Sequence, residues 1–305
     1  MVLSRTKTMK GVKDRKPMKI AIASGKGGTG KTFLSTNLFY TLQKAGKAPV
    51  LLDCDAEEPN ADIFFNGQLR YDSAISMTVP EIDTNRCTFC GRCSEFCAYN
   101  AIFIVPPVKV IRVLEELCHG CGACMVACND GAVTEKSLPV GQISWYNLSG
   151  NASLVTTRMK VGVHSPVKVI REGIAAVSQE NTVIMDAPPG TSCPFIQTVA
   201  RADYVILVTE PTPFGLSDLK QAVAFLQQLH KPFGVVVNRA GVGDRAVFDY
   251  LHHENISLLM EIPFNKKIAE LYAGGSLYAT YDNSWQHELA AMYDKIASTY
   301  GNSHH

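Results

Sequence analysis

The sequence predicts an α/β fold in which a doubly wound, mostly parallel sheet is interrupted by a small inserted α+β unit. Three observations support this. Short apolar runs alternate with helical stretches, a pattern typical of parallel strands that are buried on both faces. A glycine-rich loop at residues 25–32 joins the first of these runs to a helical stretch. A duplicated cysteine pattern occupies residues 87–128, in the middle of the chain.

The composition excludes several classes of protein. The 305 residues carry a net charge of +1, so no general basic field favours nucleic acid. No apolar run approaches the roughly 20 residues that a membrane span needs. We therefore expect a cytoplasmic protein without a nucleic-acid or membrane partner, and the many thiols favour a reducing compartment. Residues 1–17 are basic and predict a disordered tail, and His304-His305 indicates the remnant of a tag.

The first apolar run, residues 19–24, leads into a loop that matches G-x4-G-K-[ST], and the helical stretch 33–45 follows. Glycines allow backbone N–H groups to turn toward phosphates, and the helix N-terminus adds partial positive charge. This order of strand, loop and helix predicts a site for ATP or ADP with Mg²⁺. Lys31 is expected at the β- and γ-phosphates, and the Thr32 hydroxyl at Mg²⁺. The whole site would be formed by Gly25, Lys26, Gly27, Gly28, Thr29, Gly30, Lys31 and Thr32.

Four further strand-like runs, near residues 48–52, 181–185, 204–208 and 234–237, end in residues that can bind or react. A fifth run covers residues 257–263. Ligands of open α/β sheets bind at the carboxyl edge of the strands. We therefore expect the following residues near the nucleotide: Asp53, Asp55, Asp186, Gly190, Glu210, Pro211, Pro213, Asn238 and Arg239.

Two other segments carry expectations about structure. Residues 141–159 contain Asn, Ser and Thr and predict either a loop or a returning hairpin. Residues 285–300 predict a helix with one apolar face. This helix lacks the basic edge of a membrane-binding helix, so we expect it to pack on the core.

The form K-G-G-x-G-K-[ST], with its early Lys26, resembles the deviant Walker A motif of the MinD, Mrp and nitrogenase iron protein group. The resemblance covers about residues 18–77 and 140–280. It implies a homodimer in which Lys26 reaches the partner's nucleotide. It also implies that Asp55 orients or deprotonates the attacking water and that Asp186 holds Mg²⁺ through a water. A solvated loop lysine is the alternative for Lys26, and a turn cap is the alternative for Asp53.

The same resemblance implies further roles around the nucleotide. Asn60 would sense the γ-phosphate, although it could equally be a helix N-cap. Residues 188–190 would form a switch that moves on hydrolysis. Asn238 would read the adenine edge, and residues 210–213 would line the base pocket.

Eight of the ten cysteines form two copies of C-x2-C-x2-C-x3-C, offset by 31 residues. Thiolates at this spacing can hold iron–sulfur cubes. Structural zinc is the alternative, but its ligands usually come as two separated pairs. Disulfides are disfavoured because nothing indicates export. The two remaining cysteines are Cys54, which we expect to be buried, and Cys193.

The duplicated pattern resembles bacterial two-cluster [4Fe–4S] ferredoxins over about residues 80–138. The family usually has proline after the fourth cysteine, where this chain has Ala98 and Asn129, which loosens the turn but removes no ligand. The resemblance assigns one cluster to Cys87, Cys90, Cys93 and Cys128, and the other to Cys97, Cys118, Cys121 and Cys124. Cys193 follows Asp186 at the spacing of a bridging-cluster cysteine in the nitrogenase iron protein, but no second such cysteine is evident.

These expectations divide the chain into an ATPase domain, residues 18–78 and 139–305, and a ferredoxin-like insertion, residues 79–138, whose ends lie close together. The leading functional hypothesis is a switch ATPase, slow without its partner, that gates electron transfer from two [4Fe–4S] clusters to a metal-cluster-containing protein. The second hypothesis is an assembly or carrier ATPase of the Mrp type for iron–sulfur or mixed-metal cofactors. A positioning ATPase of the MinD/ParA kind is disfavoured because no basic membrane helix or basic patch follows the N-terminal tail.

Overall fold

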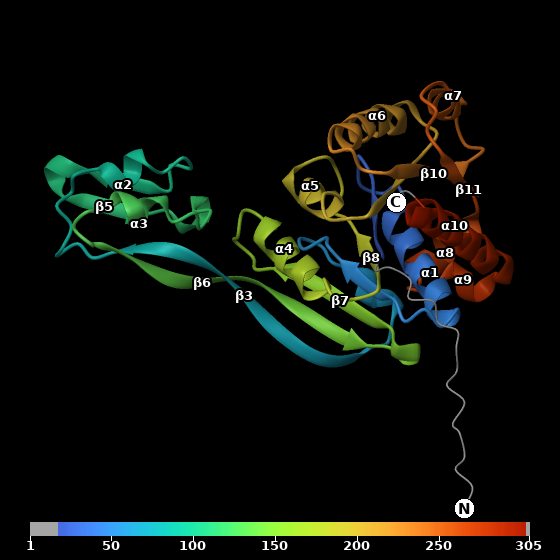
Figure 1. Ribbon diagram of the computed structural model, residues 1–305, viewed down its shortest axis with the longest axis horizontal. Helices are drawn as coiled ribbons and strands as arrows, with labels where there is room; N and C mark the ends of the chain where they lie inside the picture. The colour runs from blue at the N-terminus through green and yellow to red at the C-terminus, as the bar shows by residue number, and fades with distance from the viewer. Residues whose placement is uncertain (1–17, 303–305) are drawn as a thin grey trace, which may run out of the picture.

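The computed structural model describes residues 18–302, so the expected basic tail and the terminal histidines lie outside the described residues. The chain forms a large α/β body and a small lobe, and a long two-stranded arm joins them (Figure 1). Cysteine-containing residues 83–132 form the lobe, and the segments on either side of it form the arm and the body.

The body is built on a nine-stranded sheet with the order β11-β10-β9-β1-β8-β2-β7-β6-β3. The strands from β11 to β7 pair in parallel, whereas β6 and β3 are antiparallel at one edge. The prediction of a mostly parallel sheet is therefore confirmed. The strand bounds are β1 Met18–Ala23, β2 Val50–Asp53, β3 Gln68–Ile82, β6 Val133–Asn147, β7 Ser153–Met159, β8 Thr182–Asp186, β9 Tyr204–Thr209, β10 Phe233–Ala240 and β11 Leu258–Pro263.

Helices cover both faces of the sheet and create two apolar cores (Figure 1). One core contains residues of α4 Val167–Ala176, α5 Cys193–Val199, α6 Pro213–Gln228 and α7 Ala246–His253. The other contains residues of α1 Lys31–Lys44, α9 Tyr278–Tyr281 and α10 Asn283–Asn302, with α8 Lys266–Ala273 packed at its border. Trp285, Leu289 and Ile296 of α10 are buried in this second core, which confirms the expected docking helix.

The arm is the continuation of an antiparallel ladder that runs from the Gln68–Asn147 pair to the Ile82–Val133 pair. Residues 141–147 of β6 also pair with β7, so residues 141–159 form the returning hairpin. The ladder register shifts between Ile75 and Ser76, opposite Val140, where the arm leaves the sheet. A 15-residue strand reaches about 45 Å. The boundaries expected at residues 78/79 and 138/139 fall inside this arm, because pairing continues to Ile82 and Val133.

The lobe repeats one arrangement twice. Short helices α2 Arg92–Glu95 and α3 Ala123–Ala127 begin inside the two cysteine runs, after Gly91 and Gly122. Both glycines have positive φ, 83° and 76°, which favours glycine at the start of each helix. Strands β4 Ile102–Val105 and β5 Val110–Val113 form a two-stranded sheet beside them. The small core of the lobe contains Cys93, Ile102, Cys124 and Val133.

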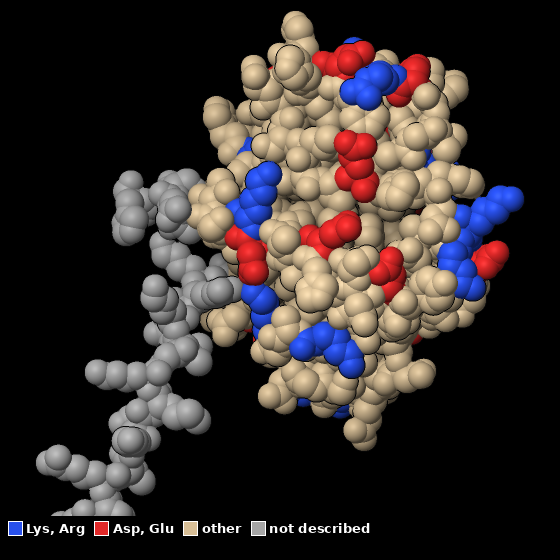
Figure 2. All heavy atoms as spheres, turned by 90° about the vertical axis from the view of Figure 1, so that its right-hand side faces the viewer, with Lys and Arg blue, Asp and Glu red and all other residues tan. Residues whose placement is uncertain are grey.

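The side of the body away from the lobe carries charges of both signs. In Figure 2 the Lys and Arg side chains on this face are interspersed with Asp and Glu rather than gathered into one basic patch. No helix among residues 18–302 is both long enough and apolar enough to span a bilayer.

Candidate functional site

The glycine-rich loop lies between β1 and α1 at the carboxyl edge of the sheet. Gly28 and Gly30 have φ values of 75° and 98°, a region that disfavours residues with a Cβ. A side chain at Gly30 would also collide with the Asn238 amide. The Asn238 Nδ2 group donates to the Thr29 carbonyl over 2.8 Å, so the end of β10 supports the loop.

Lys31 is almost completely buried, and its Nζ donates to the Lys26 carbonyl over 3.4 Å. Burial lowers the pKa of Lys31, while the nearby carboxylates of Asp186 and Asp55 act in the opposite direction. The loop thus places a lysine ammonium among acidic groups where phosphates would bind.

Asp186 ends β8 and is only 2% exposed. Burial raises its pKa to about 6, and the neighbouring Thr32 hydroxyl, Lys31 and the Ser35 hydroxyl oppose this shift. Its Oδ1 atom is buried without a hydrogen-bond partner. A buried carboxylate oxygen that lacks a partner, next to a hydroxyl, fits the oxygen ligands that Mg²⁺ prefers. Thr32 and Asp186 therefore fit the expected metal ion.

Asp53 holds the loop that follows β2. Its carboxylate accepts hydrogen bonds from the backbone N–H groups of Asp55, Asn60 and Ala61 at 2.9–3.0 Å. Burial and the nearby Asp186 raise the pKa of Asp53 to about 8, although these N–H groups oppose the shift. Of the two alternatives for Asp53, the turn cap is the one that the structure shows. Asn60 stands at the N-cap position of a short 3-10 helix, Ala61–Phe64, but its side chain makes no capping bond.

A cleft of about 1340 Å³ opens above the phosphate loop. Half of the predicted nucleotide-site residues line it, namely Gly27, Gly28, Gly30, Lys31, Thr32, Asp55, Asn60, Asn238 and Arg239. Buried Asp186 lies beneath Lys31 and Thr32. The structure does not bring the other predicted residues to the cleft wall, namely Gly25, Lys26, Thr29, Gly190, Glu210, Pro211 and Pro213.

Glu210 is instead engaged by two cations. Its carboxylate lies 3.5 Å from Lys26 Nζ and 2.8 Å from Arg239 Nη1. Pro213 begins α6, where its missing N–H costs nothing, and Thr212 caps that helix by accepting from Gly215 N. The segment after β9 therefore ties the loop to α6 and β10 in this conformation.

The end of β11 and the segment after it supply a wall of the cleft that was not predicted from the sequence. Its members are Pro263, Phe264, Asn265, Ile268, Ala269 and Tyr272. The Tyr272 ring lies 5.0 Å from the Phe64 ring and 6.4 Å from the Phe33 ring, measured between centroids. Burial raises the pKa of Tyr272, the nearby Asp186 adds to this shift, and Thr32 opposes it. The available signal was positional, because these residues follow a predicted parallel strand at its carboxyl end.

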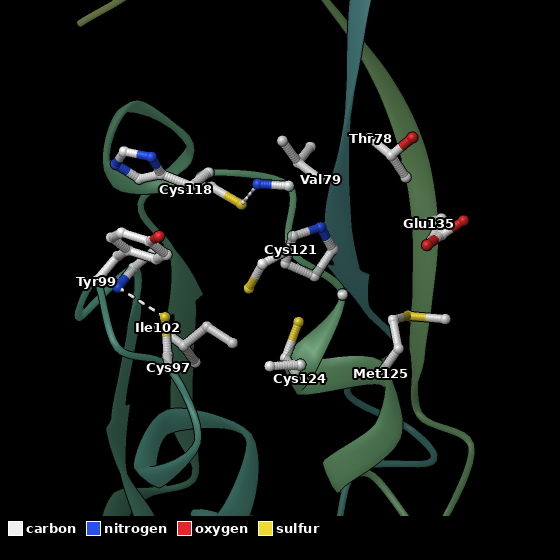
Figure 3. Close-up of a pocket in the computed structure, with 16 residues that line it drawn as sticks. Thr78, Val79, Cys97, Tyr99, Ile102, Cys118, Cys121, Cys124, Met125 and Glu135 are labelled. Atoms are coloured by element: carbon white, nitrogen blue, oxygen red, sulfur yellow. Dashed lines mark hydrogen bonds between the residues drawn. The ribbon is translucent and has the colours of Figure 1, made fainter. Parts of the chain in front are cut away.

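In the lobe, four cysteines line one small cavity that opens to solvent. They are Cys97, from the first copy of the pattern, and Cys118, Cys121 and Cys124, from the second. Figure 3 shows their sulfur atoms directed into the space between the loops and α3. Backbone N–H groups of Ala101 and Gly120 donate to the sulfurs of Cys97 and Cys118 at 3.3 and 3.4 Å.

Three cysteines of the other predicted set, Cys87, Cys90 and Cys93, lie near one another. Burial raises the pKa of Cys93, and Cys87 and Cys90 are close enough to add to the shift. Within residues 18–302, no three or more His, Cys, Asp or Glu side chains are grouped to hold a single metal ion.

A second cleft, of about 1690 Å³, separates the lobe from the body. Its lobe wall includes Tyr99, Cys118 and Cys121, which also line the cysteine cavity. Its body wall carries the basic residues Lys160, His164, Lys168 and Arg171. The last two belong to α4, which packs against α5. Helix α5 begins three residues after Gly190, so one helix pair connects the loop after β8 to this cleft (Figure 1).

A parallel sheet with a glycine-rich loop, a buried lysine and a buried strand-end carboxylate at its carboxyl edge defines a P-loop nucleotide-binding protein. Residues 20–278 match the model of the CobQ/CobB/MinD/ParA nucleotide binding domain, and the chain belongs to this family of P-loop ATPases. The chain is 31% identical over 271 residues to uncharacterized protein MJ0579 of Methanocaldococcus jannaschii, covering 87% of this chain and 93% of that one.

Two further comparisons concern proteins with assigned names. An iron-sulfur cluster carrier protein of Pyrococcus furiosus is 26% identical over 230 residues, which are 72% of this chain and 60% of the carrier. The fold is similar to that of the septum site-determining protein MinD of Pyrococcus horikoshii, solved with Mg-ADP. That match has a TM-score of 0.55 and 18% identity, and covers 93% of this chain and 98% of the MinD chain.

Proposed function

We propose that this ATPase carries two [4Fe–4S] clusters in its lobe and that its nucleotide state gates electron transfer to a metal-cluster-containing partner. The observation that carries this proposal is the cavity formed by Cys97 together with Cys118, Cys121 and Cys124 (Figure 3). In two-cluster ferredoxins, each cluster is bound by three cysteines of one run and by the fourth cysteine of the other run. Cys87, Cys90, Cys93 and Cys128 would hold the other cluster. Bound clusters would each accept and release one electron.

The position of the cavity supports a link to the nucleotide. The cysteine cavity opens to the cleft whose other wall is the segment from Lys160 to Arg171. Because α4 packs against α5, a movement of the switch at residues 188–190 would displace this wall. ATP binding would thereby alter the access of a partner to Cys118 and Cys121.

The hydrolysis site supports an in-line attack of water on the γ-phosphate. Lys31 would bind the β- and γ-phosphates, and Thr32 and Asp186 would hold Mg²⁺, which supplies charge neutralisation. Asp55 lines the cleft, and burial raises its pKa, so it is suited to orient the water and accept its proton. Asn60 would contact the γ-phosphate. Lys26 of a second copy would complete the charge around it in an ATP-dependent homodimer.

The adenine side of the cleft would be formed by Asn238 and Arg239 on one wall and by the segment after β11 on the other. Phe264 is 53% exposed and would cover the base. Glu210, Pro211 and Pro213 would reach the nucleotide only if the pairs with Lys26 and Arg239 are released.

The test is an anaerobic redox titration followed by EPR, with and without Mg²⁺-ATP, on protein assayed for iron and sulfide. We expect about eight iron atoms per chain and a change of midpoint potentials or spectra on addition of ATP. Lys31→Ala should retain the iron and lose the ATP effect. Iron-free protein would contradict the clusters, and clusters that ignore ATP in the wild type would contradict the gating.

A second candidate is cluster assembly or carriage, which the similarity to the Pyrococcus furiosus carrier favours. An assembly cluster should pass rapidly to an apo-acceptor protein, whereas an electron-transfer cluster should stay bound. Incubation of iron-loaded protein with an apo-ferredoxin, with and without Mg²⁺-ATP, separates the two functions. ATP-dependent transfer of iron to the acceptor would favour the carrier function over gated electron transfer.

A further inference from the structure

Strand β7 holds both ends of the loop that carries Asp55. At the start of the loop, the Thr157 hydroxyl donates to the Asp53 carbonyl over 2.8 Å. Beyond Asp55, the Met159 backbone N–H donates to the Ala56 carbonyl, also over 2.8 Å. The backbone on either side of Asp55 is therefore attached to one strand. The first of these bonds comes from a side chain, so a single substitution can remove it.

The Thr157 side chain is held in one orientation by its surroundings. It is completely buried, where a hydroxyl needs a hydrogen-bond partner. Its methyl group faces Gly173 of α4 so closely that a Cβ on this glycine would collide with it. Two heavy atoms on the threonine Cβ also make χ1 stiff. With the methyl group fixed against α4, the hydroxyl is directed at the Asp53 carbonyl.

The opposite side of the loop is attached to the metal side of the nucleotide site. The Cys54 N–H donates to the Asp186 carbonyl over 2.9 Å, so β8 holds the residue before Asp55. Thr157 thus completes a frame in which β7 and β8 fix the approach of Asp55 to the cleft. An attacking water has to lie in line with the γ-phosphate, and a displaced base lowers the rate even where the nucleotide binds normally.

We propose that Thr157 is a positioning residue for ATP hydrolysis, which fixes the start of the loop so that Asp55 faces the attacking water. The inference rests on the role of Asp55 proposed above. It gives Thr157 no contact with the nucleotide, since Thr157 does not line the cleft. Loss of its hydroxyl should therefore slow hydrolysis and leave nucleotide binding unchanged.

The test combines steady-state phosphate release with the affinity for a fluorescent ADP analogue, both measured with Mg²⁺ on the full-length protein. Thr157→Val keeps the shape of the side chain and removes the hydroxyl, whereas Thr157→Ser keeps the hydroxyl. We expect kcat to fall about 2- to 10-fold in Thr157→Val, the range for one hydrogen bond, with KM and ADP affinity unchanged. Thr157→Ser should recover most of the rate. Thr156→Val is the matched control, because Thr156 is also buried but points to the other face of the sheet.

Two results would overturn the inference. One is an unchanged kcat in Thr157→Val, and a lower unfolding midpoint in urea would then indicate a structural role only. The other is an equal loss of rate in Thr157→Val and Thr157→Ser, which would assign the effect to packing rather than to the hydroxyl.

Asp55→Asn separates this inference from the role of Asp55. If Asp55→Asn hydrolyses ATP like the wild type, the proposed role of Asp55 is wrong and the inference is wrong with it. If Asp55→Asn is slow while Thr157→Val is normal, the inference alone is wrong. In the Asp55→Asn background, Thr157→Val should slow hydrolysis no further, because the group that it positions is already inactive. A further loss there would show that Thr157 acts on another part of the site.

Discussion

The ammonium group of Lys26 lies 3.5 Å from the Glu210 carboxylate of the same chain, and this carboxylate also lies 2.8 Å from the Arg239 guanidinium. The Glu210 side chain is only 9% exposed, so its charge depends on these two cations. In the proposed dimer, Lys26 would have to leave Glu210 to reach the nucleotide of the partner. The ion pair would therefore restrain formation of the proposed dimer.

Replacement of Glu210 by Gln should promote the dimer. The substitution removes the charge that holds Lys26 in its own chain, and a partly screened ion pair contributes about 1 kcal/mol or less. Because each dimer releases two such pairs, we expect Mg²⁺-ATP to produce half-maximal dimer at up to about 30-fold lower protein concentration, measured by sedimentation. Glu288→Gln, at an exposed position on α10, is the matched control. Equal or weaker dimerisation of the Glu210 variant would show that the pair does not restrain Lys26.

Glu210 also shows how well the sequence predicts the position of a residue that follows a strand. A buried apolar run fixes where a parallel strand ends, and hence which edge of the sheet its last residue reaches. That was sufficient to place Asp186 at the carboxyl edge, whereas Lys31 and Thr32 were placed there by the glycine-loop motif. It does not fix the direction of a side chain after the strand, so Glu210 was expected at the base pocket whereas it pairs with Lys26 and Arg239.

Asp53 and Tyr272 show two other limits. A strand-end aspartate can serve a ligand or cap its own loop, and only the three N–H donors from residues 55–61 decide between these roles. Tyr272 enters the site from a helix more than 200 residues after the phosphate loop, and only its place after a predicted parallel strand indicated that approach. In the lobe, the resemblance to two-cluster ferredoxins predicted that Cys97 would join the second run, and Cys97 lines a cavity with Cys118, Cys121 and Cys124.

The two buried carboxyl groups, Asp53 and Asp186, predict that the stability of the fold depends on pH when Mg²⁺ is absent. Burial raises the pKa of Asp186 to about 6 and that of Asp53 to about 8, from 3.8 in the unfolded chain. Both groups bind protons more tightly when folded. Their contribution to the free energy of unfolding is therefore full below pH 3.8, and it is lost as the pH rises through 6 for Asp186 and through 8 for Asp53. The free energy of unfolding should fall over this range, by up to about 1.4 kcal/mol per pH unit for each proton.

Urea unfolding in EDTA at several pH values measures this slope. Asp186→Asn should flatten it and raise the stability at pH 8, because the substitution removes one carboxylate and its repulsion of Asp53. Mg²⁺ should stabilise the wild type at pH 8 and have little effect on the variant. A variant as pH-dependent as the wild type would contradict the coupling between the two carboxyls.

The cavity in the lobe predicts which cysteines share a cluster. Cys97→Ala should lose the same cluster as Cys121→Ala, although Cys97 belongs to the other copy of the pattern. Each variant should retain about four of eight iron atoms, since each [4Fe–4S] cluster binds four. Cys193→Ala, outside the lobe, is the matched control and should retain all of them. If Cys97→Ala instead matches Cys93→Ala in its EPR spectrum, each copy binds its own cluster and the shared arrangement is wrong.

The arm predicts that the lobe can be removed without unfolding the body. Ile82 and Val133 face each other as the last pair of the β3–β6 ladder, so a two-residue turn can replace residues 83–132. Asn-Gly suits such a turn because both positions tolerate positive φ. We expect the shortened chain to fold, to bind no iron and to hydrolyse ATP within about twofold of the iron-free full chain, since no residue of the nucleotide cleft lies in the lobe. Circular dichroism, iron assay and phosphate release measure these three properties. A folded chain that has lost hydrolysis would show that the lobe takes part in the ATPase site.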